Sequence, residues 1–219
     1  MWVCTGCGVK AMRALRDRLG LTFSGGPKRT VDKVIVTTGG SPQRRGWEWL
    51  EKLNHRIEEP LPSLFTFSMP AEAVTDLQGI VVEKTLVSIQ GPKLKAAGPL
   101  LVTHWVMSVP AILKLSSLGA RLLHEKGYDF QIQVNWADEQ TNNLVLEKLQ
   151  GIAAEHGNKI LANFRPYYLP ERLWRFLLEK CDLPATKKWG ELGKKGVNIL
   201  VAILTNDIDA VQGKTSFRE

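Results

Sequence analysis

Hydrophobic and polar residues follow an alternating order of strand-like and helix-like patterns between residues 99 and 166. Residues 130–134, Phe-Gln-Ile-Gln-Val, alternate with a period of two, which is typical of a β-strand with one buried face. Apolar residues at helical spacing come before this strand in 112–123 and after it in 144–153, and a glycine follows each helical segment. Short apolar runs complete a β-α-β-α-β order, with strands expected at 99–105, 130–135 and 159–164.

Helical connections of this length join strands by right-handed crossovers, so the three strands should be parallel. Apolar runs at 33–38 and 198–204 indicate two further strands, and 80–87 indicates a strand nearer the sheet edge. The expected fold class is therefore α/β, a three-layer, mostly parallel open sheet of flavodoxin-like or related Rossmann type. Ligands of such sheets bind outside the carboxyl ends of the strands. Additional helices are expected at 12–19, 47–57 and 170–180.

Three regions are expected along the chain. Residues 1–30 form an N-terminal helical extension, residues 31–184 an α/β flavodoxin-like domain, and residues 185–219 a basic loop with an added strand. The extension contains Cys4 and Cys7 at CxxC spacing, which suits half of a zinc site or a redox pair. No second CxxC follows, so ordinary thiols are the alternative and no metal site is assigned.

Composition narrows the class of protein. Apolar residues make up 44% of the 219 residues, which is enough for a full hydrophobic core. No apolar run reaches the ~20 residues that cross a bilayer, and the first residues lack a signal-peptide pattern. With three cysteines, a cytoplasmic location without membrane contact is expected. The net charge of +7 favours a phosphorylated small molecule or nucleic acid as partner, although a plain basic surface explains it equally.

The loop 39–46, Gly-Gly-Ser-Pro-Gln-Arg-Arg-Gly, lies between a predicted strand and a predicted helix. Free backbone N–H groups and the helix dipole make such a junction a binding site for anions. Arg44 and Arg45 would add positive charge and bidentate donors. The alternative is a plain turn between a strand and a helix, which favours the same residue types.

A second motif follows the strand expected at 99–105. It reads Ser108-Val109-Pro110-Ala111-Ile112-Leu113-Lys114, with Trp105 before it. Together with Gly40-Ser41-Pro42-Gln43-Arg44, this stretch resembles the NAD(P)H-dependent FMN reductase and quinone reductase family, which is flavodoxin-like. The resemblance implies a flavoprotein oxidoreductase that binds FMN at the carboxyl ends of a parallel sheet. Electrons would pass from NAD(P)H to a small acceptor.

The predicted site combines this resemblance with the strand ends of the expected sheet. Aromatic faces, hydrogen-bonding groups and arginines at one rim, which also includes Tyr167 and Tyr168, suit a flat ring that carries a phosphate. Hydride transfer would then belong to the cofactor, so no catalytic side chain is assigned. The alternative is that the aromatic residues only cap the edge of the core. The predicted cofactor-binding residues are Gly40, Ser41, Arg44, Arg45, His104, Trp105, Ser108, Asn135 and Trp136.

Two other functions fit the same patterns. Basic charge and aromatic residues favour a non-catalytic nucleotide-binding or nucleic-acid-binding α/β domain. Residues 131–166 also loosely resemble the C-terminal domain of a two-Rossmann glycosyltransferase that uses a sugar nucleotide. A flavoprotein purifies yellow, so colour separates the first function from both alternatives.

Overall fold

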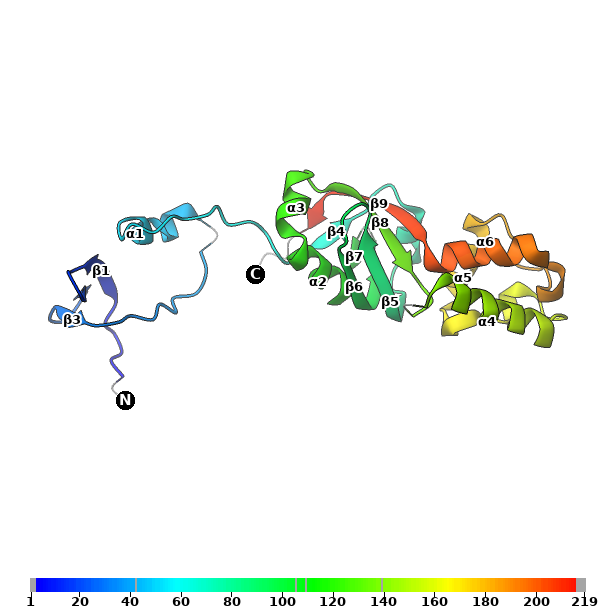
Figure 1. Cartoon of the computed structure of the whole chain (residues 1–219), viewed down its shortest axis with the longest axis horizontal. Helices are drawn as coiled ribbons and strands as arrows, with labels where there is room; N and C mark the ends of the chain where they lie inside the picture. The colour runs from blue at the N-terminus through cyan, green and yellow to red at the C-terminus, as the bar shows by residue number, and fades with distance from the viewer. Residues whose placement is uncertain (1–2, 42, 105, 109, 139, 216–219) are drawn as a thin grey trace. The chain divides into compact units, whose positions relative to one another are not determined.

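The computed structural model describes residues 3–41, 43–104, 106–108, 110–138 and 140–215. The chain forms two compact units, Met1–Pro60 and Leu61–Glu219, and each is described by itself (Figure 1). In the described parts of the chain, no helix is long and apolar enough to span a membrane.

The first unit contains a three-stranded antiparallel sheet of β1 (Val9–Ala14), β2 (Leu19–Phe23) and β3 (Arg29–Val31). An irregular segment, a short turn η1 (Arg44–Gly46) and the single-turn helix α1 (Glu48–Glu51) follow. The helices expected at 12–19 and 47–57 are therefore wrong or much shorter, and 33–38 is not a strand. None of the described residues in this unit is fully buried, so these residues form no buried hydrophobic core.

A seven-stranded sheet forms the first half of the second unit, and all its neighbouring strands run antiparallel. The order across the sheet is β10-β4-β7-β6-β5-β8-β9. The strands are β4 (Thr66–Ser68), β5 (Val81–Ile89), β6 (Lys95–Val102), β7 (Val106–Ser108), β8 (Asp129–Asn135), β9 (Asp207–Gln212) and β10 (Lys214–Thr215).

The sheet closes on itself at Gly213. β9 and β10 stand at opposite ends of the strand order, yet only this glycine separates them in the chain. The N–H of Gly213 donates to the carbonyl of Tyr128 at 2.8 Å, and its carbonyl accepts from the N–H of Ser68 at 3.1 Å. Its φ of +132° is a conformation that residues with a side chain rarely adopt. One kinked segment therefore pairs with both edges and makes the sheet a barrel.

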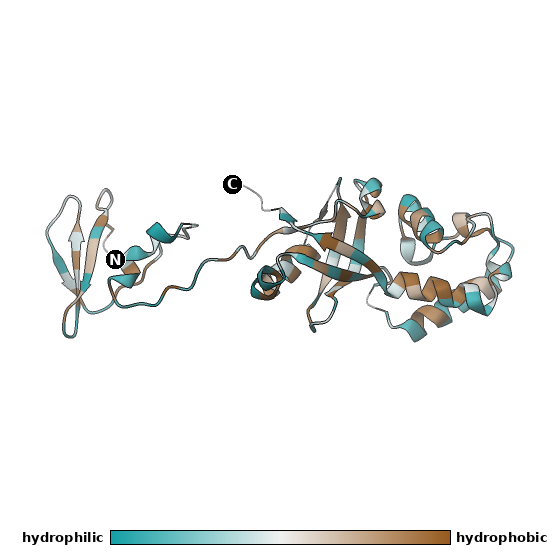
Figure 2. Cartoon of the chain, turned by 90° about the horizontal axis from the view of Figure 1, so that it is seen from above, coloured by the Kyte–Doolittle hydropathy of each residue, from teal (hydrophilic) through white to brown (hydrophobic). Residues whose placement is uncertain are grey.

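Alternating apolar residues fill the barrel. On β8, Phe130, Ile132 and Val134 are buried while Gln131 is exposed, and the ring of Phe67 meets that of Phe130 edge-on at 5.1 Å. Helix α2 (Pro110–Leu118) packs on β5 and β6, and α3 (Ala120–Glu125) follows it; the turn η2 (Ala73–Leu77) precedes β5. Figure 2 shows apolar residues along the barrel strands and in the helices beyond them.

A helical subdomain, residues 136–206, is inserted between the adjacent strands β8 and β9 (Figure 1). Helices α4 (Asn142–Glu155) and α6 (Gly193–Thr205) pack on each other. Buried tryptophans stabilise the subdomain, because the rings of Trp174 and Trp189 stack 6.2 Å apart and Trp174 Nε1 donates to the carbonyl of Leu161 at 2.7 Å. The remaining elements are α5 (Glu171–Lys180) and the turns η3 (Leu161–Asn163), η4 (Pro166–Tyr168) and η5 (Trp189–Glu191).

The antiparallel barrel overturns the expected three-layer parallel sheet. The strand at 130–135 and the helices at 112–123, 144–153 and 170–180 are confirmed as elements, but the strands they connect are not parallel. Residues 159–164 form no strand, because Ile160 makes an isolated bridge with Lys188 and the turn η3 follows it, and residues 198–204 belong to α6. The strand expected at 99–105 is part of β6, which ends at Val102.

The boundary between the two units lies between Pro60 and Leu61. The boundaries expected from the sequence were after residues 30 and 184. Residue 30 lies in β3 of the first unit, and residue 184 lies between α5 and α6 of the helical subdomain. The helical segments of residues 136–206 therefore interrupt a barrel, and the segment 207–215 completes it.

Candidate functional site

A pocket of about 370 Å³ lies where the barrel meets the helical subdomain, and we call it the Tyr167 pocket. Its volume is within the range of small-molecule sites. Strand β5, the segment after β8, helix α4 and the turn η4 all contribute to its walls. Its lining includes Glu83, Lys84, Trp136, Asp138, Lys148, Tyr167 and Tyr168.

Tyr167 lines this pocket, and its hydroxyl is buried and has no hydrogen-bond partner among the described residues. Burial raises the pKa of Tyr167 to about 12, so the phenol stays protonated and can donate. Leaving a buried donor unpaired costs about 1–3 kcal/mol. A ligand oxygen that accepted from this hydroxyl would recover that energy.

The backbone at the pocket is strained at adjacent aromatic residues. Tyr167 has φ = 56° and Tyr168 has φ = 54°, both in the left-handed region that bulky residues avoid. Asp138, which lines the same pocket, has φ = 55°. Such conformations cost about 1–3 kcal/mol each and cluster at functional sites, where the surrounding structure maintains them.

A β-bulge places two charged residues of β5 on the pocket. The pairing of β5 with β6 shifts register between Val82 and Thr85, so Glu83 and Lys84 lie outside the regular ladder. Bulges of this kind redirect side chains and are common beside functional sites. Here Lys84 contacts the carboxylate of Asp138 at 3.2 Å, which joins β5 to the segment after β8.

The pocket has a second lysine, Lys148. Unlike Lys84, it forms no ion pair with a described carboxylate. Its Nζ lies 4.0 Å from the centre of the Tyr167 ring, and no ion pair joins it to a described residue. A cation over an aromatic face is stabilised by the ring quadrupole but still carries its full charge. The pocket thus combines a free donor with an ammonium group.

A second polar group connects the subdomain to the barrel, and we call it the Lys180 cluster (Lys180, Asp207 and Asp209). The ammonium of Lys180, at the end of α5, lies 2.5 Å from Oδ1 of Asp207 and 2.8 Å from Oδ1 of Asp209. Trp136 Nε1 donates to Oδ2 of Asp207 at 2.9 Å, whereas Oδ2 of Asp209 has no described partner. Both aspartates are at most 1% exposed.

Burial in this cluster governs its ionisation. Burial, reinforced by the charge of Asp207, raises the pKa of Asp209 to about 6. Burial also raises the pKa of Asp207, against the opposing effects of Lys180 and Trp136. Burial alone would lower the pKa of Lys180, but the charges and hydrogen bonds of the two aspartates together raise it.

The match to a protein family agrees with this architecture. A family model described as "HI0933-like protein barrel and H2TH domain" matches residues 61–219. The chain belongs to the HI0933-like family. The matched residues coincide with the second unit, its closed barrel and its inserted helices. A search of curated proteins gave no match.

Membership of the HI0933-like family overturns the resemblance to FMN and quinone reductases. The resemblance placed a strand of a parallel sheet directly before the helix that begins at Pro110. In the structure the strand before this helix is β7, which pairs with β6 in the antiparallel direction. The function inferred from it, a flavin-dependent oxidoreductase of flavodoxin-like fold, loses its basis for the same reason. Both alternative functions were expected in an α/β domain, and the antiparallel barrel overturns that fold for them as well.

The predicted phosphate loop lies in the first unit, outside the HI0933-like match. Gly40 and Ser41 line a cavity of about 530 Å³ in that unit together with Trp47 and Trp49. The hydroxyl of Ser41 donates to the carbonyl of Gln43 at 3.0 Å. The helix after the loop is α1, a single turn, and so offers little of the dipole that the prediction assumed.

Arg44 is already neutralised within that unit. Its guanidinium contacts Glu51 at 2.7 Å and Glu59 at 3.5 Å. Arg45 is exposed. Anion binding by this loop stays a prediction.

The other predicted residues belong to the HI0933-like unit. His104 is exposed after β6, Ser108 ends β7, and Trp105 lies outside the described residues. Asn135 stabilises the segment after β8, because its Nδ2 donates to the carbonyl of Gln140 at 3.0 Å and its Oδ1 accepts from the N–H of Ala137 at 2.8 Å. Trp136 lines the Tyr167 pocket, as do the tyrosines that were expected at the same rim.

Sequence reasoning missed Lys148 and the whole Lys180 cluster. Asp207 and Asp209 are two residues apart, a spacing that puts both side chains on one face of a strand. This spacing predicts the pair of aspartates only if residues 207–212 are first recognised as a strand. Lys148 lies on the helix expected at 144–153, but nothing in the sequence relates it to Tyr167.

Among the described residues, no group of three or more His, Cys, Asp or Glu side chains is arranged to hold a metal ion. Cys4 and Cys7 are exposed free thiols in the first unit.

Proposed function

We propose that residues 61–219 form a binding module for a small phosphorylated molecule, which occupies the Tyr167 pocket. The observation that carries the proposal is the buried hydroxyl of Tyr167, which has no partner among the described residues, on a ring that the ammonium of Lys148 covers. A phosphate oxygen is a strong acceptor for the phenol, and its charge complements Lys148. The bulge in β5 and the strained turn η4 support a site that is held ready for a ligand.

The apolar part of the ligand would lie against Trp136 and Pro170, which line the same pocket. Trp136 is fully buried and its indole N–H is engaged with Asp207, so it forms a fixed wall. Small-molecule sites typically combine such apolar walls with a few polar groups that fix orientation.

Calorimetric titration of the purified chain with AMP, adenosine and inorganic phosphate tests the proposal. AMP should bind and adenosine should not, because adenosine lacks the charged oxygens. Tyr167→Phe should weaken AMP binding by about 5- to 30-fold, the equivalent of ~1–2 kcal/mol for a lost hydrogen bond to a charged group. Tyr168→Phe is the matched control, since Tyr168 is fully exposed and shares the same backbone conformation.

Equal binding of AMP by wild type and Tyr167→Phe would refute the assignment, as would the absence of binding by both phosphate probes. An ordered water held by the Tyr167 hydroxyl and not displaced by AMP would also contradict it. FMN binding stays a prediction, now without a family resemblance behind it, and the same titration with FMN tests it.

We keep a cytoplasmic location as part of the proposal. It is supported by the three cysteines, all of which are free thiols, as is usual in a reducing compartment. Detection of the protein in a membrane or secreted fraction would contradict it.

A further inference from the structure

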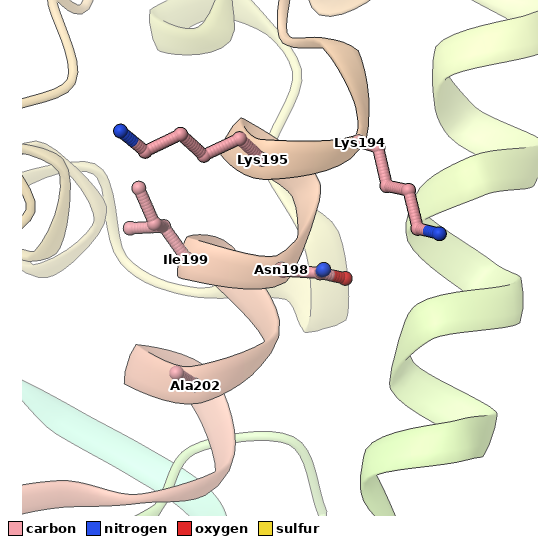
Figure 3. A pocket seen from close by; sticks show the side chains of 5 residues that line it. All are labelled: Lys194, Lys195, Asn198, Ile199 and Ala202. Carbon is pink, nitrogen blue, oxygen red and sulfur yellow. The ribbon is translucent and has the colours of Figure 1, made fainter.

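An open groove of about 540 Å³ runs along α6, and we call it the α6 groove. It is lined by Lys194, Lys195, Asn198, Ile199 and Ala202, all from that helix. Figure 3 shows Lys194 and Asn198 on the side of α6 that faces the neighbouring helix, and Lys195 with Ile199 on the other side. Positions four apart share a side of a helix, so each side carries one lysine near the helix start.

Three more lysines lie on turns close to this helix start, and we call Lys159, Lys187 and Lys188 the turn lysines. Ile160 bridges Lys188, and the carbonyl of Lys187 accepts from the N–H of Leu161 at 2.8 Å, so the two segments lie side by side. The turns are held together at Gly157 and Gly190, where the N–H of Gly190 donates to the carbonyl of Gly157 at 2.9 Å. A Cβ at Gly157 would lie 2.8 Å from the carbonyl oxygen of Ala153, so the backbone after α4 requires glycine at this position.

No carboxylate among the described residues forms an ion pair with any of these five lysines. The segment 187–195, Lys-Lys-Trp-Gly-Glu-Leu-Gly-Lys-Lys, contains four lysines and one acid. That acid, Glu191, accepts from the backbone N–H of Lys188 at 3.3 Å. Four of the five lysines are exposed, and Lys187 is half-buried. The end of the helical subdomain therefore has a concentration of positive charge that no described ion pair neutralises.

We propose that the α6 groove and the turn lysines bind the phosphate backbone of a nucleic acid. The arrangement favours a polymer over a single anion, because Lys194 and Lys195 extend in different directions from α6 (Figure 3). Successive phosphates along a strand match several separated ammonium groups, and their neutralisation releases counterions. The proposal is independent of the Tyr167 pocket, because none of these lysines lines it.

Fluorescence anisotropy of the full chain with a labelled DNA duplex of about 20 base pairs, measured over a range of salt concentrations, tests this interface. The double variant Lys194→Gln, Lys195→Gln should weaken binding by about tenfold and reduce the magnitude of the log–log salt slope by about 2. Substitution of the three turn lysines by Gln should weaken binding further. Each variant should keep a melting temperature close to that of the wild type, since four of the five lysines are exposed and none forms an ion pair with a described carboxylate.

The matched control is Lys93→Gln, Lys95→Gln, which removes the same charge from exposed lysines at the start of β6. It should leave the affinity and the salt slope close to those of the wild type. An equal loss of binding in this control would show that net charge alone attracts DNA, and would overturn the interface. Absence of duplex binding at low salt would overturn it too, and so would a preference for vesicles of anionic lipid over the duplex.

Discussion

The ionisation of Asp209 gives a direct test of how burial of the Lys180 cluster affects the free energy of unfolding. Its carboxylate is 1% exposed and shares Lys180 with Asp207, and burial raises its pKa to about 6 from an ordinary value of 3.8. Because the folded state holds this proton more tightly than the unfolded state, the stability it provides is complete below pH 3.8. That stability is lost as the pH rises to about 6. A difference of about two pKa units corresponds to ~3 kcal/mol in the free energy of unfolding.

The test substitution is Asp209→Asn. It keeps an oxygen that accepts from Lys180 and removes the ionisable carboxyl group. Urea unfolding at about pH 4.5 and pH 7.5 gives the free energy of unfolding of wild type and variant. Relative to wild type, the variant should gain about 2 kcal/mol in stability between the two pH values, since most of the titration lies in that interval. The difference between pH values is decisive, because the loss of one charge beside Lys180 also changes stability at any single pH.

Asp129→Asn is the control, because Asp129 is an exposed aspartate at the start of the neighbouring strand β8. Its stability relative to wild type should change little between the same two pH values. Asp207 and Asp209 titrate as a pair, so the transition is expected to be broad. If wild type and Asp209→Asn differ by the same free energy at both pH values, the buried aspartate does not titrate as described.

Three further predictions concern stability. Trp136→Phe should destabilise the unit by ~1–3 kcal/mol in urea unfolding, because it leaves a carboxylate oxygen of buried Asp207 without its donor. Gly213→Ala should cost ~1–3 kcal/mol because of its φ of +132°. By contrast, Gly151→Ala, in the open interior of α4, should stabilise by about 0.5–1 kcal/mol, and an equal effect at both glycines would contradict the closure argument. Tyr167→Phe should raise or leave unchanged the melting temperature without ligand, and a marked loss would mean that the hydroxyl already has a partner.

Periodicity predicted local elements but not their pairing. The period-two pattern of 130–134 gave a correct strand with the correct buried face, and the helical spacing in 144–153 and 170–180 gave correct helices. The partners of β8 are β5 and β9, which lie about 40 residues before and 70 residues after it, and no local pattern encodes that choice. A parallel sheet was inferred from connection length alone, and an inserted subdomain produces the same spacing.

The run 198–204 shows why α6 was mistaken for a strand. Its residues, Asn-Ile-Leu-Val-Ala-Ile-Leu, are nearly all apolar, and a short apolar run fits a buried strand and a buried helix equally. Including Gly196 and Val197 restores the helical spacing, because the buried apolar side chains of α6 are Val197, Leu200, Val201 and Leu204. The β-branched residues favoured the strand, and packing against α4 determined the helix.

The candidate site was predictable only in part. Trp136, Tyr167 and Tyr168 were expected at one rim and do line one pocket, although the rim belongs to a barrel. The strain at Tyr167 and the missing partner of its hydroxyl are properties of the folded chain. No sequence pattern predicts them, because they arise where four separate segments meet.

The closure of the barrel at Gly213 has a consequence for synthesis on the ribosome. The seam joins β4 to β10, and the hydroxyl of Thr66 donates to the carbonyl of Thr215, 149 residues later in the chain. At a translation rate of about 5–20 residues per second, the nascent chain carries an unsealed sheet for on the order of ten seconds. During that time β4 has one unpaired edge, and Phe65 before it and Phe67 within it are fully buried only in the closed barrel. The folding of this unit should therefore depend on holding chaperones more strongly than its modest size suggests.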